Sequence, residues 1–316
     1  MLDALKFVQG AVAKKDFVQE LTHFHISEGF IKGYNGSLAL CSPIDLNLEV
    51  VPKAKPFVKA IQTCKETAQL HMTPAGRLSI KSGNFKAFVD CLDVRPMAIA
   101  PEGQMVKLDG NLLKALKTLN PFIAEDASRH WARGIMFRGP SAFATNNVTL
   151  VEYWLGYNFP VEVNIPKPAV QELLRIGEEP ISIQVCENSV TFHFEGKRWL
   201  RTQCYPTNWP DMGRVFNREA NPQGLPEGFF AALMDLAPFV DELGRIFMLG
   251  TKMATTPAEG LGVSMDLDGL PEQGIYQVKQ LQLLEGVVQK IDLTQYPAPC
   301  LFYGDKLRGA IVGMRG

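Results

Sequence analysis

The chain has 316 residues, of which 46% are hydrophobic and 21% charged, and its formal net charge is −1. This composition is typical of a soluble protein with enough apolar residues for more than one core. No apolar run is long enough to span a bilayer, and the N-terminus lacks the pattern of a secretory signal. A cytoplasmic protein is therefore expected.

Charge is unevenly distributed along the chain. Residues 1–99 contain 12 Lys and Arg against 9 Asp and Glu, whereas residues 216–316 contain 8 against 12. A protein with this balance cannot bind nucleic acid with its whole surface, because phosphates attract only basic regions. Any contact with DNA must come from a local basic face.

Two sets of amphipathic segments recur in chain order. Apolar residues at helical spacing predict helices in two sets, which start near Ala4, Gly110 and Gly228 and near Lys55, Lys167 and Val278. The starts are 106 and 118 residues apart in the first set and 112 and 111 residues apart in the second. Both sets indicate one repeat of about a domain's length.

Strand-like segments follow each of these helices. The tails of the three repeats share a strand–turn–strand pattern, in which Gly83, Gly196 and Gly304 are expected to supply positive φ at the turns. Further strands are expected between the two helices of each repeat, and the first such stretch carries the hairpin signal Asn35–Gly36.

Proline-rich stretches at residues 92–103 and 205–226 separate the repeats. We therefore predict an α+β fold of three repeated domains, residues 1–99, 100–215 and 216–316, each with two helices packed on antiparallel sheet. The alternative is one large α+β domain with coincidental similarity. Three such units leave a free sheet edge at each end, and a head-to-tail two-fold pairing of two copies would close both edges into a ring.

Patterns typical of enzymes and metal sites are missing. The six cysteines form no CxxC pair, which disfavours zinc or redox chemistry and predicts buried thiols. His23 and His25 share a face of an expected strand with no third ligand nearby, so solvated side chains are expected there. No phosphate loop, nucleophile elbow or dinucleotide motif occurs. We expect a non-enzymatic protein without a cofactor; an enzyme using Cys204 or His193 in a pocket between repeats is the alternative.

Three segments carry a resemblance to a known family: GIMFRGPSAFATNNVTLVEYWL (134–155), residues 163–216, and LRGAIVGMRG (307–316). They are similar to the central strand pair, the proline-led helix with its hairpin, and the terminal strand of the bacterial sliding clamp, the β subunit of DNA polymerase III. The resemblance follows the element order of the whole chain. The chain is shorter than cellular clamps, which would suit a bacteriophage-encoded member.

The resemblance implies a homodimeric ring with the DNA clamp fold that encircles duplex DNA without sequence specificity. Such a ring acts as a processivity factor, tethering DNA polymerase and meeting the clamp loader through short linear motifs in a hydrophobic peptide pocket. The alternative from the same fold is an adaptor or decoy that binds clamp partners without encircling DNA.

The resemblance also implies a partner-peptide pocket between the second and third domains. An apolar lining there would suit aliphatic and aromatic anchors. The implied residues are Ala132, Thr145, Asn147, Val148, Thr149, Leu150, Ile311, Val312, Met314 and Arg315. Gly313 stands where the family commonly has Pro, and Gly316 where it often has a large apolar residue, so the family's peptide preference is not carried over to this pocket. Because Gly313 lacks the proline ring that would stiffen the chain, a more mobile pocket is expected.

Basic residues on the helices and the loops after them are expected to face DNA, together with one aromatic residue. These are Lys6, Lys14, Lys15, Lys55, Lys59, Lys114, Lys117, Arg129, Trp131, Arg133, Lys167 and Arg175. The third domain departs from this pattern, because its first helical region carries Asp235, Asp241 and Glu242 and no lysine.

Apolar residues on the last strand of the first domain and near the end of the third domain's first helix are expected to form the dimer interface, since exposing them together would be unfavourable. The residues concerned are Phe85, Phe88, Val89, Pro238 and Phe239.

Overall fold

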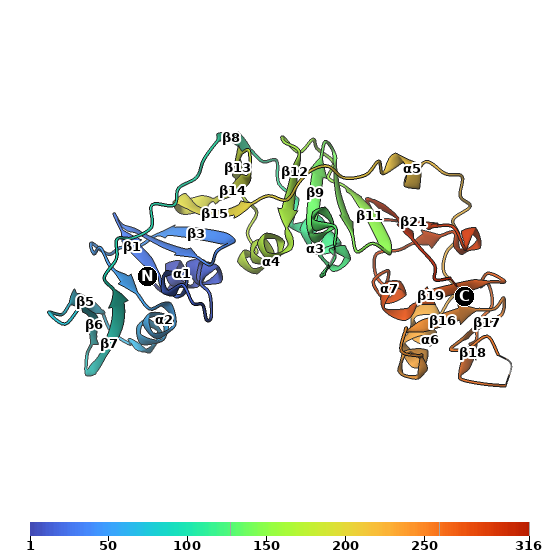
Figure 1. The fold of residues 1–316 in the computed structure, drawn as a ribbon, viewed down its shortest axis with the longest axis horizontal. Helices are drawn as coiled ribbons and strands as arrows, with labels where there is room; N and C mark the ends of the chain where they lie inside the picture. Colours follow the sequence, from blue (N-terminus) through green and yellow to red (C-terminus); the bar gives the residue numbers. More distant parts are fainter. Residues whose placement is uncertain (127, 259, 316) are drawn as a thin grey trace. The chain divides into compact units, whose positions relative to one another are not determined.

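The computed structural model, shown in Figure 1, describes residues 1–126, 128–258 and 260–315. The order of elements repeats three times: a helix, a group of strands, a second helix and a second group of strands. The predicted α+β class is thus confirmed. No helix within the described residues is long and apolar enough to cross a membrane.

The first repeat comprises α1 (Leu2–Val8), β1 (His25–Ser27), β2 (Phe30–Tyr34), β3 (Leu38–Pro43), β4 (Val51–Pro52), α2 (Ala54–Thr63), β5 (Gln69–Met72), β6 (Arg77–Ser82) and β7 (Phe85–Leu92). The second comprises β8 (Gln104–Lys107), α3 (Leu112–Leu119), β9 (Gly134–Arg138), β10 (Ser141–Thr145), β11 (Thr149–Trp154), β12 (Val163–Pro166), α4 (Lys167–Ile176), β13 (Ser182–Cys186), β14 (Ser189–Phe194) and β15 (Arg198–Gln203). The third comprises α5 (Gly213–Phe216), α6 (Phe229–Leu236), β16 (Arg245–Met248), β17 (Lys252–Ala254), β18 (Ser264–Asp266), β19 (Gly274–Gln277), α7 (Val278–Gln282), β20 (Lys290–Ile291), β21 (Cys300–Gly304) and β22 (Leu307–Ile311).

The helices form where apolar residues recur every three or four positions. In α2, Phe57 and Ile61 are buried one turn apart, whereas Lys55 and Lys59 are exposed on the other face. Burying one stripe of a helix leaves its lysines in solvent. This helix therefore contributes to the core with one face and presents positive charge with the other.

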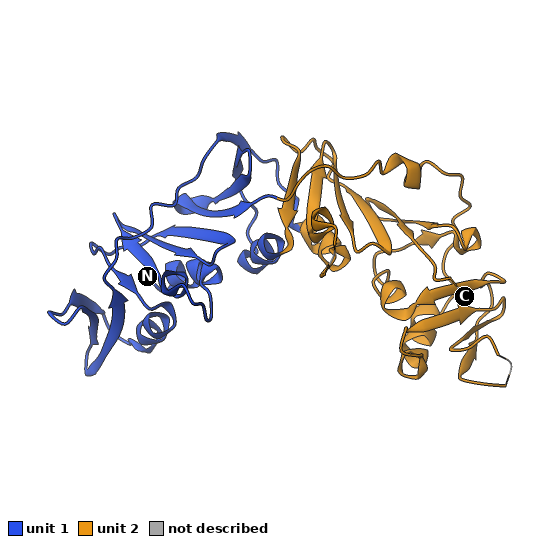
Figure 2. Cartoon of the chain, in the orientation of Figure 1, with its two compact units in different colours: residues 1–113, 168–204 blue, residues 114–167, 205–316 orange. Residues whose placement is uncertain are grey.

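The chain divides into two compact units, coloured separately in Figure 2. Unit 1 contains residues 1–113 and 168–204, and unit 2 contains residues 114–167 and 205–316. Unit 1 holds a seven-stranded sheet, β1-β2-β3-β15-β14-β13-β8, and a four-stranded sheet, β4-β7-β6-β5. Unit 2 likewise holds a seven-stranded sheet, β12-β9-β10-β11-β22-β21-β20, and a four-stranded sheet, β18-β17-β16-β19.

Each seven-stranded sheet joins two consecutive repeats. The third strand after the first helix of one repeat pairs antiparallel with the last strand of the next repeat, β3 with β15 in unit 1 and β11 with β22 in unit 2. The compact units therefore divide the second repeat between them. The domain boundaries predicted from sequence do not follow these units and stay a prediction.

The four-stranded sheets keep open edges. Among the described residues, β18, the third strand of the third repeat, pairs only with β17. The last strand of the first repeat, β7, pairs with β6 along its length and with the short β4 only at its end. A third strand pairs with a last strand in β3–β15 and in β11–β22. The remaining third strand, β18, and the remaining last strand, β7, have no such partner among the described residues.

The turns only partly follow the glycine prediction. Gly36 has φ 93° between β2 and β3, and Gly83 and Gly196 have φ 55° and 72° in their hairpins. The prediction for Gly304 is wrong, because the positive φ in that turn belongs to Lys306, at 55°. Gly304 is required for another reason: a Cβ there would lie 2.0 Å from the carbonyl oxygen of Val287.

The expectation of solvated histidines is also wrong. His23 and His25 are both buried, and the Nδ1 atom of His25 accepts a hydrogen bond from the Met97 amide at 3.1 Å. Desolvation by burial lowers the pKa of His25. No cluster of three or more metal-binding side chains occurs in the part of the chain that the structure describes.

Candidate functional site

The hairpin of β10 and β11 carries half of the predicted pocket residues, from Thr145 to Leu150. The Oδ1 atom of Asn146 accepts the amides of Val148 and Thr149 at 3.1 and 2.8 Å, and Asn147 adopts φ 71°. The Thr145 hydroxyl donates to the Thr149 carbonyl at 2.9 Å. This hydrogen-bonded turn fixes Val148 at the end of the hairpin.

The second half of the predicted pocket lies beside this turn. In the register of β11 and β22, Thr149 faces Ile311 and Leu150 faces Ala310. Beyond β22, the Val312 amide donates to the Val148 carbonyl at 2.9 Å. The structure therefore brings together the two segments, distant in sequence, that were expected to form one site.

The tail after β22 is held on both sides. The Met314 amide donates to the Ile275 carbonyl on β19 at 2.7 Å, and the Tyr296 hydroxyl donates to the Met314 carbonyl at 2.8 Å. A Cβ on Gly313 would lie 2.5 Å from the Tyr296 ring. The missing side chain of Gly313 is what allows Tyr296 to pack there, and the greater mobility expected of this segment stays a prediction. Gly316 lies outside the described residues.

An apolar cluster from the linker before the third repeat covers the adjoining face of the sheet. Trp209, Met212 and Phe216 are buried together with Met136 and Phe143 of β9 and β10. This linker cluster is bordered by half-buried apolar side chains, which we call the linker patch: Trp131, Leu150, Val215, Ala220 and Tyr303. Burial of such side chains against a sheet face is favourable by roughly 25 cal/mol per Å² of apolar surface.

The accessible part of the site is smaller than the predicted residue set. Ala132, Thr145, Thr149 and Ile311 are buried in the sheet. Val312 is exposed and Leu150 is half-buried; Asn147 and Arg315 are also exposed, while Val148 and Met314 are half-buried. A ligand could thus meet Leu150, Val312 and Met314 directly, while the buried residues support them.

Charges near the patch are already paired. The Arg308 Nε atom donates to Glu152 at 2.6 Å, and the Arg308 guanidinium lies 4.7 Å from the centre of the Phe216 ring. The Glu152 carboxylate also accepts the Ser141 hydroxyl at 2.7 Å. A peptide anchor at the linker patch would therefore meet mainly apolar surface, because the charges of Arg308 and Glu152 compensate each other.

The expected DNA-facing residues fall into two groups. Six lysines are exposed and form no ion pair within the described residues: Lys6, Lys14, Lys15, Lys55, Lys59 and Lys117. Others are engaged with protein groups. Lys114 lies 3.4 Å from Asp305 and Lys167 lies 3.2 Å from Glu125.

The arginines expected to face DNA are partly committed to structure. Arg175 donates to the carbonyls of Lys6 and Phe7 at 3.2 and 2.7 Å and also bonds to Glu172. Its role in this structure is to fasten α4 to the end of α1. Arg129 lies 6.0 Å from the centre of the Trp131 ring, and Arg133 is half-buried.

The expected interface residues do not share one surface. Along β7, Phe85 and Val89 point to one face and Phe88 to the other, because side chains alternate in a strand. Val89 is only 1% exposed, whereas Phe88 is 52% and Phe239 is 59% exposed; Phe85 is half-buried and Pro238 exposed. Val89 is therefore part of the core and not of any exposed surface.

Comparison with known proteins places this architecture. No family model matches the sequence, and the search among curated proteins gave no match. Among solved structures, a beta sliding clamp of C. crescentus is 17% identical, with a TM-score of 0.83, over 100% of this chain and 97% of that chain. The DNA polymerase beta subunit of Streptococcus pyogenes is 15% identical, with a TM-score of 0.82 and the same coverage. The Helicobacter pylori beta clamp bound to a DNA ligase peptide is 17% identical, with a TM-score of 0.79, over 99% of this chain and 97% of that chain.

The chain has the sliding-clamp fold.

Within this clamp fold, sequence reasoning missed the residues that complete the candidate pocket. Gln280 on α7 accepts hydrogen bonds from Asn146 and Thr149 at 2.7 and 3.3 Å. Trp209 packs against Trp131 with the ring centres 4.9 Å apart and the ring planes tilted by 54°. The apolar residues in the proline-rich stretch before the third repeat were the available signal, since a fully solvated linker would not need them.

In the enzymatic alternative Cys204 and His193 are the candidate catalytic groups; Cys204 directly follows β15, and His193 lies on the neighbouring β14. Burial raises the pKa of the Cys204 thiol to about 12, so the reactive thiolate is scarce at neutral pH. His193 bonds to the Gln184 side chain at 3.1 Å on the neighbouring strand.

Proposed function

We propose that this protein is a DNA sliding clamp: a non-enzymatic, cytoplasmic processivity factor that forms a homodimeric ring around duplex DNA. The observation that carries the proposal is the whole-chain likeness to beta sliding clamps. It is supported by two open strands, β18 and β7, which are of the two kinds that pair with each other in the seven-stranded sheets. Pairing β18 of one copy with β7 of another would repeat the junctions β3–β15 and β11–β22 twice more and close a ring of six repeats.

The surroundings of the two edges support this pairing. Phe88 lies three residues after the start of β7, and Ala310 lies three residues after the start of β22. Phe88 thus has the position of Ala310, which faces Leu150 on β11 in the shared sheet. Beside β18, Leu261 and Val263 are exposed. An antiparallel β7–β18 pairing would bury these apolar groups together, which is the expected driving force for dimerisation.

Topological binding is the decisive test of the clamp function. The protein, loaded onto a nicked circular plasmid, should remain bound through gel filtration and should dissociate once the plasmid is linearised. Light scattering should give the mass of two chains, and Phe239→Asp should give monomers, because Phe239 is 59% exposed and belongs to the expected interface. A dimer of Phe239→Asp would remove Phe239 from the interface, and retention on linear DNA would contradict encirclement.

Contact with DNA should involve phosphates alone. Replacing Lys14, Lys15, Lys55 and Lys59 by Glu should abolish retention on circular DNA and leave the dimer intact. The logarithmic slope of affinity against salt concentration should weaken by roughly 0.9 for each phosphate that the variant no longer neutralises. Replacing four other exposed lysines by Glu, Lys81, Lys197, Lys290 and Lys306, is the control with the same change in net charge, and equal weakening in both variants would contradict the assignment. A footprint at a defined base sequence would contradict phosphate-only contact.

The surface formed by Leu150, Val312 and Met314, at the tail that follows β22, is proposed as the docking site for peptides of DNA polymerase, the clamp loader and other replication proteins. A few apolar anchors, each contributing on the order of 1.5–3 kcal/mol, could give micromolar affinity. A labelled polymerase C-terminal peptide should bind the intact protein and fail to bind after deletion of residues 314–316, with the dimer unchanged. Equal binding by both would place the partner site elsewhere.

An adaptor that binds clamp partners without encircling DNA is the second candidate. The acidic side chains of the third repeat favour it: Asp235 and Glu242 are exposed beside α6, and no lysine accompanies them. Peptide binding without retention on circular DNA would select this function.

A further inference from the structure

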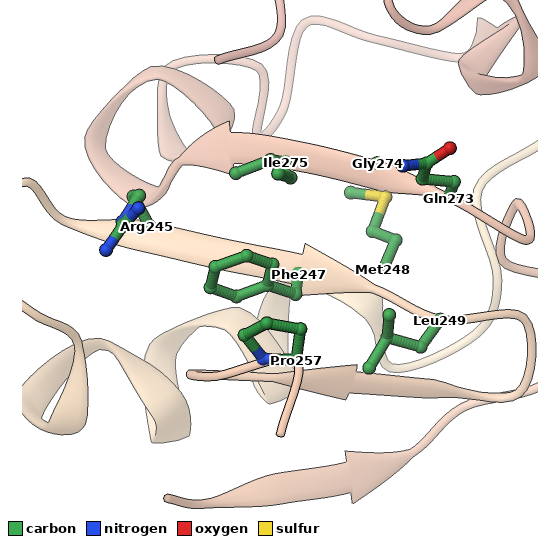
Figure 3. A pocket seen from close by; sticks show the side chains of 8 residues that line it. All are labelled: Arg245, Phe247, Met248, Leu249, Pro257, Gln273, Gly274 and Ile275. Carbon is green, nitrogen blue, oxygen red and sulfur yellow. The ribbon is translucent and has the colours of Figure 1, made fainter. Parts of the chain in front are cut away.

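A cavity of about 300 Å³ lies on one face of the four-stranded sheet of unit 2. Figure 3 shows Arg245 and Phe247 on β16, Ile275 on β19 and Pro257 from the loop before β18 around it. The lining is mainly apolar, and the Arg245 guanidinium is held by Asp241 at 2.6 Å. The site is distinct from the linker patch and includes none of its residues.

The strand register gives this cavity an equivalent in the second repeat. Arg245 pairs with Gln277, the residue before α7, just as Gly134 pairs with Pro166, the residue before α4. Counting from these pairs, Phe247 on β16 holds the position that Met136 holds on β9. Ile275 on β19 likewise corresponds to Asn164 on β12.

In the second repeat, this position is covered by the segment that follows β15. That segment pairs with β12 through the Tyr205 amide, which donates to the Asn164 carbonyl at 3.0 Å. Four residues later, Trp209 is buried in one cluster with Met136. Pro210 follows the tryptophan directly.

The first repeat is covered in the same way. His23 pairs with Lys53, the residue before α2, so His25 holds the position of Met136. The segment that follows β7 lies over it, with the Met97 amide bonded to His25 at 3.1 Å. Two residues on, Ile99 packs against the buried cluster around Trp199.

The third repeat begins the same arrangement. The segment after β22 pairs with β19 through the Met314 amide, which donates to the Ile275 carbonyl at 2.7 Å. At the place that Trp209 fills in the second repeat, the described residues leave the cavity beside Phe247.

We propose that this cavity binds an extended, proline-flanked peptide of another protein through one bulky apolar side chain. The occupant's chemistry follows from the chain's own segments, because Trp209 precedes Pro210 and Ile99 precedes Pro101 by two residues. Proline keeps such a segment extended and lowers the entropy cost of binding. A volume of this size lies at the lower end of the range for ligand sites, roughly 300–1,000 Å³. The proposal does not depend on DNA encirclement.

The test uses the full-length protein and a fluorescein-labelled peptide, YPTNWPDM, which copies residues 205–212. The peptide should bind, and its Trp→Ala version should bind at least about tenfold more weakly, as for a buried anchor. Leu249→Trp, which fills the cavity from its rim, should weaken binding to a similar degree. Leu243→Trp, an exposed position outside the lining, is the matched control and should bind normally.

Methyl NMR of the unmodified protein identifies where the peptide sits, whatever the variants do to folding. The methyl signal of Met248, which lines the cavity, should shift on titration, and that of Met136 should not. A shift of Met136 would mean that the peptide displaces the linker at its own place, and this would overturn the proposal. Absence of binding, or equal binding by the Leu249→Trp variant, would overturn it as well.

Discussion

The seven-stranded and four-stranded sheets are built from the same repeat, yet only the seven-stranded sheets are complete. In the former, a third strand meets a last strand from the next repeat, as Leu40 meets Leu200 in the β3–β15 register. In the four-stranded sheets, β18 corresponds to the third strands β3 and β11, and β7 corresponds to the last strands β15 and β22. Neither β18 nor β7 has such a neighbour among the described residues. The local pattern is therefore the same, and what differs is whether the chain itself supplies the next strand. This difference separates residues that stabilise the fold from residues that are free to join two copies.

The largest effect should come from the complete junction. Leu200 is fully buried at the β3–β15 seam, and Leu200→Ala should lower the free energy of unfolding by about 2–5 kcal/mol, because apolar burial is removed and a residual cavity is left. Chemical denaturation measures this change. Leu261→Ala, an exposed leucine beside an open edge, should change the stability of the fold by less than about 0.5 kcal/mol. Similar destabilisation in both variants would contradict the comparison.

A substitution on the open edge of β7 should weaken the dimer and leave the stability of the fold unchanged. Phe88→Asp should weaken dimerisation by about 2–4 kcal/mol, or roughly 30- to 1,000-fold in the dissociation constant, because it places a charge in the proposed interface. Sedimentation equilibrium measures the constant. Phe17→Asp is the control, since Phe17 is fully exposed on a loop; a dimer equally strong in both variants would exclude β7 as the contact.

A local cap should affect neither sheet edge. The Glu179 carboxylate accepts the amides of Leu112 and Leu113, both at 3.1 Å, at the start of α3. Glu179→Ala should cost about 0.5–2 kcal/mol of stability, the usual range for removal of a helix cap. Glu187→Ala, an exposed acid in the same unit, should be neutral, and the dimer should persist in both. A neutral Glu179→Ala would show that water replaces the cap.

The smallest effect concerns pH and the segment that covers β1. Because burial lowers the pKa of His25 below its ordinary value of 6.5, the unfolded chain binds more protons than the folded chain between the two pKa values. Stability linked to His25 is thus fully present above pH 6.5 and is lost as pH falls toward the folded-state pKa. Unfolding measured at pH 7.5 and 5.5 should show a smaller pH dependence in His25→Gln than in the unmodified protein. An unchanged dependence would mean that other groups carry it, and His71→Gln, at an exposed position, is the control.

Much of the fold could be predicted from the sequence because its signals are local. Helical spacing in LLKALKTL and the Asn35–Gly36 turn depend only on neighbouring residues, and both appear in the structure as expected. The repeat of these signals indicated the element order. Family resemblance added the two segments of the candidate pocket, and the strand register places them side by side.

Other features depended on contacts between distant residues. The burial of His25, the packing of Tyr296 against Gly313 and the cover of Met136 by Trp209 each join segments far apart in the chain, and no periodicity predicts them. Gly304 belongs with these features, because it is needed for the close approach to the Val287 carbonyl, while the positive φ of the turn lies at Lys306.

The sequence by itself determined which stretches are helices and strands and that they recur three times, because apolar periodicity and turn residues act within a few positions. Only the tertiary structure decided which strands are left without a partner and which sheet faces are covered. Which strands pair and which sheet faces are covered depend on the register between strands, and that register is fixed only when segments distant in the sequence pack together. Both proposed interfaces, the β7 and β18 edges and the cavity beside Phe247, arise at that level.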